Sequence, residues 1–258
     1  MSAYNKKKKK ITLFLFQVSI LIIFLLIWDI LARYKIINTF LFSSPTNIYK
    51  TIISLVNNDL FKHVGITTFE VFVGFILTSV LGILVAVIFW WCPTVYKIFD
   101  PYVTVLNSLP KVALGPLIII WFGSGIKSII FMTITISVFS TIINVYHGFS
   151  SVQRNLIVMI KSFGASKMQI FNKVVLPSNL LVIMTTLKIN ISLCLVGVIM
   201  GELLVSKEGL GYLIMYGSQI FNLDLVITSI FLLGILSFVF YYILEFIIKF
   251  INKRDFFG

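Results

Sequence analysis

Seven residues that could contact a polar solute lie inside or beside long apolar stretches of this 258-residue sequence. A charged side chain at the centre of a bilayer costs about 2.5–3.5 kcal/mol on insertion scales, so polar groups in such places are default candidates for a solute pathway. Amides and hydroxyls can hydrogen-bond a solute, and a proline leaves a backbone carbonyl without its helical donor. The predicted pathway residues are Asn107, Ser108, Pro110, Pro116, Asn144, Asn190 and Glu202. Hydrogen bonds between helices and packing kinks are the alternative roles for these residues.

Patterns for catalysis or metal binding are missing from the sequence. The two histidines, His63 and His147, and the two cysteines, Cys92 and Cys194, are not clustered at ligand spacing. The segment "FGSGIKS" resembles a phosphate loop only superficially, because it lacks the full GxxxxGK[ST] pattern. We therefore expect no catalytic residue, no metal site and no cofactor bound by this chain.

The composition is that of a membrane protein. Hydrophobic residues make up 59% of the chain and charged residues 12%, about half of the charged share of an average soluble domain. Apolar runs of about 20 residues recur, and in lipid such runs must be helical to satisfy their backbone groups. The net charge of +12 is explained by membrane orientation, so no nucleic-acid partner is expected.

The apolar runs predict an all-α integral membrane fold with six transmembrane helices. The run after the lysine-rich start is too long for a signal peptide and is predicted to be a retained span. The third span contains Pro110, Gly115 and Pro116, which predict a bent or broken helix. The predicted spans are Ile11–Leu31, Thr68–Trp91, Tyr102–Phe122, Ile126–Tyr146, Leu180–Val205 and Leu225–Ile248.

Basic residues predict the orientation of these spans. Of the 21 Lys and Arg residues, thirteen would lie on the side of the N-terminus and six on the other side. Cytoplasmic loops carry the excess of basic residues, so both termini are expected in the cytoplasm of a multi-pass plasma-membrane protein. The predicted organisation is a basic N-terminus (1–10), a single transmembrane domain (11–250) and a cytoplasmic tail (251–258). On the outer side, Ser44 and Pro45 predict the start of a short helix.

A charged segment at 150–177 interrupts the apolar sequence on the cytoplasmic side. Ser150 with Gln153, and Ser166 with Gln169, have the spacing of capping boxes that start helices. Gly164 between them predicts a left-handed turn. The segment should therefore form a helix–turn–helix hairpin.

The hairpin is predicted to be amphipathic. Pro177 is expected to end its second helix. Apolar residues that can share a face are Val152, Leu156, Met159, Ile160 and Phe163 on the first helix, and Ile170, Phe171, Val174 and Val175 on the second. The lipid surface, the neighbouring spans or a soluble partner could cover these stripes.

The segment "GASKMQIFNKVVLP" resembles the cytoplasmic coupling motif of ATP-binding-cassette importer permeases, with Gly164, Val174, Leu176 and Pro177 at the matching positions. The segment "GVIMGELLVSKEGLGYLIMYG" is similar to the continuation found in the nitrate, sulfonate, taurine and thiamine-precursor branch of that family. Together the similar segments cover about residues 41–250.

This resemblance implies a type I importer permease bundle with a cytoplasmic coupling hairpin. It implies ATPase subunits that bind ATP and magnesium, an extracellular solute-binding protein that delivers and largely selects a small solute, and a permease homodimer in the lipid bilayer. The residues that the resemblance assigns to ATPase coupling are Met159, Ile160, Phe163, Gly164, Ala165, Ser166, Ile170, Phe171, Leu176 and Pro177. The alternative is a secondary transporter or channel that needs no ATPase; it predicts inverted repeats or paired ionisable residues, which the sequence does not show.

The sequence departs from the family pattern in two places. Val158, Met159 and Ile160 replace the usual Glu-Ala-Ala, so the acidic anchor for the ATPase is missing. Burial of an apolar stripe would have to supply the attraction instead. Glu70 stands where the branch often carries a basic residue.

Overall fold

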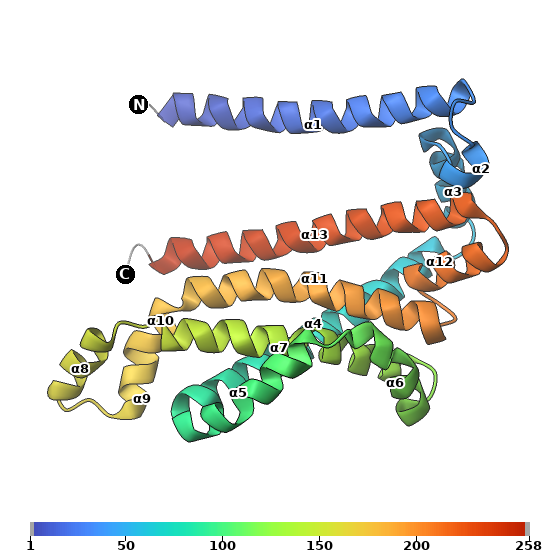
Figure 1. Ribbon diagram of the computed structural model, residues 1–258. Coiled ribbons are helices and arrows are strands. Elements are labelled where there is room, and N and C mark those ends of the chain that lie inside the picture. Colours follow the sequence, from blue (N-terminus) through green and yellow to red (C-terminus); the bar gives the residue numbers. More distant parts are fainter. Residues whose placement is uncertain (1–2, 256–258) are drawn as a thin grey trace. The chain divides into compact units, whose positions relative to one another are not determined.

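The computed structural model describes residues 3–255, and every regular element in that range is helical. Figure 1 shows the elements in chain order. They are α1 (Ala3–Arg33), α2 (Thr39–Phe42), α3 (Pro45–Val56), α4 (Leu60–Trp91), α5 (Pro93–Ser108), the 3-10 turn η1 (Lys111–Leu114), α6 (Gly115–Phe122), α7 (Ile126–Ser150), α8 (Arg154–Ser162), α9 (Lys167–Ile170), the π-helical turn η2 (Phe171–Val175), α10 (Leu176–Ser178), α11 (Leu180–Val205), α12 (Leu210–Gln219) and α13 (Leu223–Asp255).

The chain forms two compact units. The first comprises the residues up to Phe61 together with Leu213–Phe231, and the second comprises Lys62–Tyr212 together with the residues from Leu232 onward. Each is described by itself below. The predicted division into residues 1–10, 11–250 and 251–258 stays a prediction, and residues 256–258 of the predicted tail lie outside the described part of the chain.

In the first unit, α3 begins as the sequence predicts. Ser44 is its N-cap and accepts a hydrogen bond from the backbone nitrogen of Asn47 at 3.1 Å, while Pro45 occupies the first turn. The neighbouring Ser43 donates a hydrogen bond of 2.5 Å to Asp224. The carboxylate of Asp224 thereby ties the start of α3 to a segment far away in the sequence.

Four of the described helices are long and apolar enough to cross a membrane, or five if a bent pair counts as one span. The four are α4, α7, α11 and the part of α13 from Leu223 to Phe250. They correspond to four of the six predicted spans, with α4 beginning earlier than expected. The predicted first span lies in α1, where part of the side chains fall outside the described residues.

The predicted third span is bent, as its prolines indicate. The axes of Pro93–Ser108 and Lys111–Phe122 differ by 89°. Leu109 is extended, with φ −61° and ψ 145°, which is the conformation favoured before a proline. Lys111 donates hydrogen bonds of 3.0 Å to Asn107 Oδ1 and to the Ile136 carbonyl on α7. The lysine therefore connects the bend to α7.

Helices α7 and α11 pack along each other and form the centre of the second unit (Figure 1). Their close approach depends on Gly197 and Gly201, one helical turn apart on α11. A Cβ atom at Gly197 would lie 2.6 Å from the Cα of Thr133, and one at Gly201 would lie 3.0 Å from the Cα of Ile129. Small residues at this spacing allow membrane helices to come into backbone contact.

This packing predicts that Gly197→Val destabilises the protein. The added atoms would collide with the α7 backbone, and overpacking of this kind costs about 1–3 kcal/mol. Gly234→Val is the matched control, because Gly234 on α13 has no heavy atom within 4 Å of the position where its Cβ would stand. Thermal unfolding in detergent should show a lower midpoint for Gly197→Val only. Equal midpoints for the two variants would contradict the close-packing account.

Candidate functional site

The segment between α7 and α11 is a helix–turn–helix hairpin at one end of the second unit (Figure 1). Gly164 at the turn has a φ of +80°, in the left-handed region that favours glycine. Its backbone nitrogen bonds to Lys161 O at 3.0 Å, and that of Ala165 bonds to Ile160 O at 3.4 Å. These two bonds form a Schellman motif that ends α8. The predicted glycine turn is confirmed.

One of the two predicted capping boxes is present. Ser166 Oγ accepts from the backbone nitrogen of Gln169 at 3.3 Å, and Gln169 Oε1 accepts from the backbone nitrogen of Ser166 at 2.8 Å. The other prediction was wrong. Ser150 still belongs to α7, where its hydroxyl donates to the His147 carbonyl, and α8 begins after Gln153 without a side-chain cap. Helix α7 extends beyond the predicted span end at Tyr146 and includes Ser150 as its last residue. Ser150 is therefore not available to cap α8.

Pro177 does not end the second helix, contrary to the prediction. The helical path continues through Ser178 and breaks at Asn179. Residues Phe171–Val175 form a π-helical turn, in which the Leu176 nitrogen bonds to the Phe171 carbonyl. Proline has no N–H to donate to the helical hydrogen bonds. The wider π-helical turn just before Pro177 lets the helical path continue past it.

Phe171 attaches the hairpin to the bundle. Its ring centroid lies 5.0 Å from that of Trp90, 6.1 Å from that of Trp91 and 5.5 Å from that of Phe149. Ile170 and Val175 are buried in the same cluster. Lys167 adds a hydrogen bond to the Trp91 carbonyl and lies over both indole rings. The second helix is therefore fixed to the ends of α4 and α7.

The first helix of the hairpin has a different burial pattern from the predicted one. Val152, Ile157 and Ile160 pack partly against the cluster around Phe171. Leu156, Met159 and Phe163, which were predicted to share a face with Val152 and Ile160, are exposed instead, Phe163 by 83%. Apolar residues occur on nearly all sides of α8, so the bundle can bury only some of them. The side away from the bundle is an exposed apolar surface on the described chain.

The predicted coupling residues thus fall into three groups. Met159 and Phe163 are exposed, Gly164 and Ser166 form the turn, and the rest contact the bundle or connect to α11. The buried or partly buried members are Ile160, Ala165, Ile170, Phe171 and Leu176, while Pro177 is exposed in the first turn of α10.

Four predicted pathway residues lie at the bend after α5. Asn107 accepts from Lys111, and the Ser108 hydroxyl donates to the Val105 carbonyl at 2.8 Å. Pro110 is exposed at the break, and Pro116 is exposed in the first turn of α6. Asn107 and Lys111 thus form a polar contact at this bend.

Asn190 belongs to a buried polar network at the middle of the second unit. Its side chain donates to Ser79 Oγ at 2.8 Å and to Thr78 Oγ1 at 3.2 Å. Cys194 lies 3.3 Å from Thr78 and 3.5 Å from Ser137, so the network joins α4, α7 and α11. Asn144 is separate and donates weakly to Ser140 at 3.4 Å. The contacts of Asn190 connect helices, whereas that of Asn144 lies within α7. A contact with solute stays a prediction for both asparagines.

Glu202 lies at the opposite end of the second unit from the hairpin. It is 1% exposed and accepts hydrogen bonds of 2.6 Å from the Thr67 hydroxyl and from the Gly211 backbone nitrogen. The Leu210 nitrogen bonds in turn to Thr67 at 2.8 Å. Glu202 thus holds the start of α12 against α4, and Glu70 stands beside it. The structure does not bring Glu202 together with the other predicted pathway residues.

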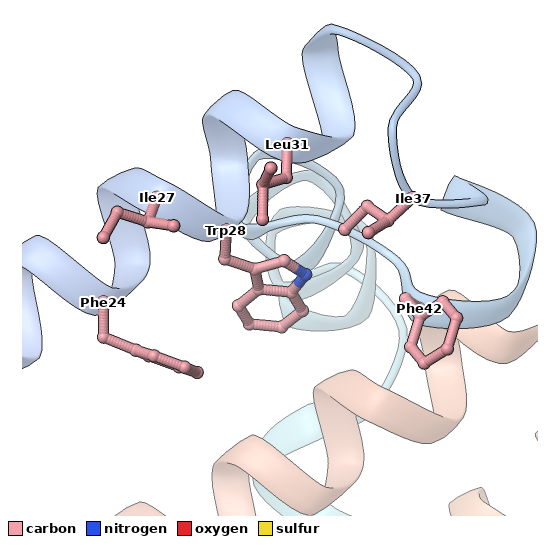
Figure 2. Close-up of a pocket in the computed structure, with 6 residues that line it drawn as sticks. All are labelled: Phe24, Ile27, Trp28, Leu31, Ile37 and Phe42. Atoms are coloured by element: carbon pink, nitrogen blue, oxygen red, sulfur yellow. The ribbon is translucent and has the colours of Figure 1, made fainter.

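An apolar pocket in the first unit is a poor candidate for a solute site. Figure 2 shows its lining, in which the indole nitrogen of Trp28 is the one polar side-chain atom. The pocket has a volume of about 350 Å³ and is lined by Phe24, Ile27, Trp28, Leu31, Ile37 and Phe42. Solute sites combine apolar walls with several polar groups that orient the ligand.

Several contact residues were not identified from the sequence. Trp90 and Trp91 pack against the ring of Phe171. Lys111 donates a hydrogen bond to α7 at the bend after α5. Thr67 connects Glu202 to α12. The tandem tryptophans at the end of a predicted span were a usable signal, whereas nothing in the local sequence of Thr67 indicates its distant partners.

Comparison with known families and proteins identifies a matching family and several relatives of this chain. The family described as "Binding-protein-dependent transport system inner membrane component" matches residues 78–255. The formylaminopyrimidine transport permease protein ThiX of Halalkalibacterium halodurans is 33% identical over 213 residues, which is 83% of this chain and 85% of that protein. The taurine transport system permease protein TauC of Escherichia coli is 25% identical over 229 residues, 86% of this chain and 83% of that protein.

The fold is also that of a solved importer. An inward-facing structure of the MetNI methionine ABC transporter superposes with a TM-score of 0.66 at 21% identity, covering 74% of this chain and 94% of that chain. The predicted bundle of a type I importer permease is therefore confirmed. The chain belongs to the family of inner membrane components of binding-protein-dependent transport systems, and it is the permease subunit of an ATP-binding-cassette importer.

Proposed function

We propose that the hairpin 150–177 transmits force from a separate ATPase subunit to the membrane helices. The observation that carries this proposal is that the hairpin has two apolar sides with different surroundings. One side is fixed to the bundle through Phe171, and the other is exposed around Phe163. A connector between two bodies needs both an anchor and a docking surface.

The docking surface consists of exposed apolar side chains. They are Leu156, Val158, Met159, Phe163 and Met168, with exposed fractions of 40–83%. Their burial in a cleft of the ATPase would supply the attraction, at about 25 cal/mol per Å² of apolar surface. This surface takes the place of the acidic anchor that the sequence lacks at 158–160. We expect the facing cleft to be correspondingly apolar.

The energy source is proposed to lie outside this chain. Residues 123–125, which resemble part of a phosphate loop, form the turn between α6 and α7. ATP and magnesium are therefore expected on the ATPase partner, and this chain is expected to catalyse no reaction. Closure of two ATPases on a permease homodimer would then move the helices that carry the hairpins.

The hairpin end of the second unit is proposed to face the cytoplasm, with both termini on that side. The Glu202 end then faces outward, toward an external solute-binding protein. The named relatives transport different solutes, formylaminopyrimidine and taurine among them. We therefore assign this chain only the class of small polar organic solutes.

Uptake by reconstituted vesicles tests this function. Vesicles that contain the permease, a co-expressed ATPase and ATP should import solute delivered by the binding protein. Vesicles with the permease alone should not. Import by the permease alone, without ATP, would exclude the coupled mechanism.

Gly164→Val should uncouple the transporter. A β-branched residue in the left-handed region strains the turn by about 1–2 kcal/mol, which would displace Phe163 from its position. Gly123→Val is the control for backbone strain away from the hairpin, because Gly123 also has a positive φ, +76° with a ψ of −176°, and equally open surroundings at the other end of the unit. Uptake should fall in the first variant only, with both variants inserted in the membrane. Unchanged uptake in Gly164→Val would show that the turn is not a coupling element.

Phe163→Ala should weaken binding of the ATPase and leave the permease stable. A buried aromatic anchor at an interface contributes about 2 kcal/mol or more, which corresponds to about 30-fold in affinity. The matched control is Phe61→Ala, since Phe61 is 75% exposed in the first turn of α4. Affinity is measured by titrating the ATPase onto the permease in lipid nanodiscs. Unchanged affinity in Phe163→Ala would place the docking surface elsewhere.

A further inference from the structure

A lysine at the bend between α5 and α6 has no acidic partner in residues 3–255. The ammonium group of Lys111 donates hydrogen bonds of 3.0 Å to Asn107 Oδ1 and to the Ile136 carbonyl, which are both neutral. The ring of Phe139, 5.8 Å from Nζ, is also uncharged. The ion pairs of the described chain are formed by other basic residues. The positive charge of Lys111 is therefore solvated but not neutralised.

The neighbouring elements offer no carboxylate. Asp and Glu are absent from η1 itself and from α6 and α7, which pack against it. The one acidic residue of α5 is Asp100, which lies seven residues before Asn107 and thus about 10 Å away along the helix. A counter-charge for Lys111 must come from outside these elements.

The charge lies at the depth of the bilayer centre. Helix α7 is long and apolar enough to cross a membrane. Ile136, whose carbonyl accepts from Lys111, lies ten residues after the first residue of α7 and fourteen before its last. This is about 15 Å along the helix, which is half of the thickness of the hydrocarbon core. A charge at that depth is costly unless it faces polar groups or a water-filled path, and it is far from the lipid headgroups.

Asn107 adds hydrogen-bond donors beside the ammonium. Its Oδ1 atom accepts from Lys111, and its Nδ2 atom donates to no acceptor of the described chain. The ammonium has three N–H groups and uses two of them on Asn107 and Ile136. Both side chains are only partly buried, and the adjoining Pro110 is exposed. The remaining N–H groups and the positive charge are together complementary to an anionic oxygen group.

We propose that Lys111 and Asn107 bind the anionic group of a small organic solute, a carboxylate, sulfonate or phosphate, at the bend of the permease. This inference rests on the proposed function, because it takes the bend as part of the solute path, and it names the charge of the solute. The Ile136 carbonyl positions the ammonium group. Cationic analogues of equal size should be excluded.

Three compounds of similar size test the proposal: butanoate, butanamide and butylammonium. Their binding is measured by calorimetry on the full chain in phosphatidylcholine nanodiscs, without ATPase or ATP. Butanoate should bind saturably and tighter than butanamide by about tenfold or more, as expected for a close charge pair, and butylammonium should not bind. Equal binding of the three compounds, or no saturable binding of butanoate, would overturn the proposal. Because this assay needs no coupling, its failure would leave the ATPase mechanism untouched.

Variants at the bend make the test specific. Lys111→Gln removes the charge and should abolish the preference for butanoate over butanamide, whereas Lys111→Arg keeps the charge and should retain it. Asn107→Asp supplies a carboxylate of the chain's own beside the ammonium, so it should abolish butanoate binding and raise the thermal midpoint. The control is Lys127→Gln, which removes the same charge from the exposed first turn of α7 and should bind as the unmodified protein does. A retained preference in Lys111→Gln or Asn107→Asp, or an equal loss in Lys127→Gln, would overturn the proposal.

An anionic lipid headgroup carries the same chemistry as such a solute. Native mass spectrometry after exposure to phosphatidylglycerol distinguishes the two sources. The unmodified protein and Lys111→Gln should retain the same amount of this lipid. Retention by the unmodified protein that is lost in Lys111→Gln would assign the site to a lipid headgroup and overturn the solute assignment.

Discussion

The packing of Phe171 between Trp90, Trp91 and Phe149 is the interaction on which the proposed coupling role of the hairpin depends. Ring contacts of this kind contribute about 0.5–1.5 kcal/mol each beyond the area they bury. They fix the second helix of the hairpin to α4 and α7, and the π-helical turn at 171–175 carries the chain onward into α11. In the proposed mechanism, a force applied at the exposed side of α8 reaches the membrane helices through this packed cluster.

The close contact of α7 with α11 extends this rigid connection across the membrane. Gly197 and Gly201 bring the two helices into backbone contact, and the Asn190 network links them to α4. At the far end, Glu202 holds α12 against α4 through Thr67. The hairpin and Glu202 thus lie at opposite ends of one packed unit. The proposed function needs such an arrangement, because events at the hairpin end must change access at the other end.

The sequence was sufficient for the fold class, for the turn at Gly164, for the cap at Ser44 and for the bend at Pro110, because each follows from local backbone chemistry. Its resemblance to importer permeases correctly indicated the family. Burial on α8 could not be predicted, since apolar residues occur nearly all round that helix and only the neighbouring spans decide which of them are covered. The end of the second helix was also missed, because a π-helical turn accommodates Pro177 and has no clear local signature. The partners of Glu70 and Glu202 are distant in sequence and required the structure.

The most direct test of the central claim is the number of ATP molecules hydrolysed per solute imported by a Phe171→Ala variant in reconstituted vesicles. The account predicts that the ATPase still docks, because Phe163 is untouched, but that hydrolysis no longer drives import and the ratio rises several-fold. Phe171→Leu, which keeps an apolar side chain of similar reach, should give a smaller increase. An unchanged ratio in a Phe171→Ala variant that still folds would contradict the claim that this anchor transmits the force.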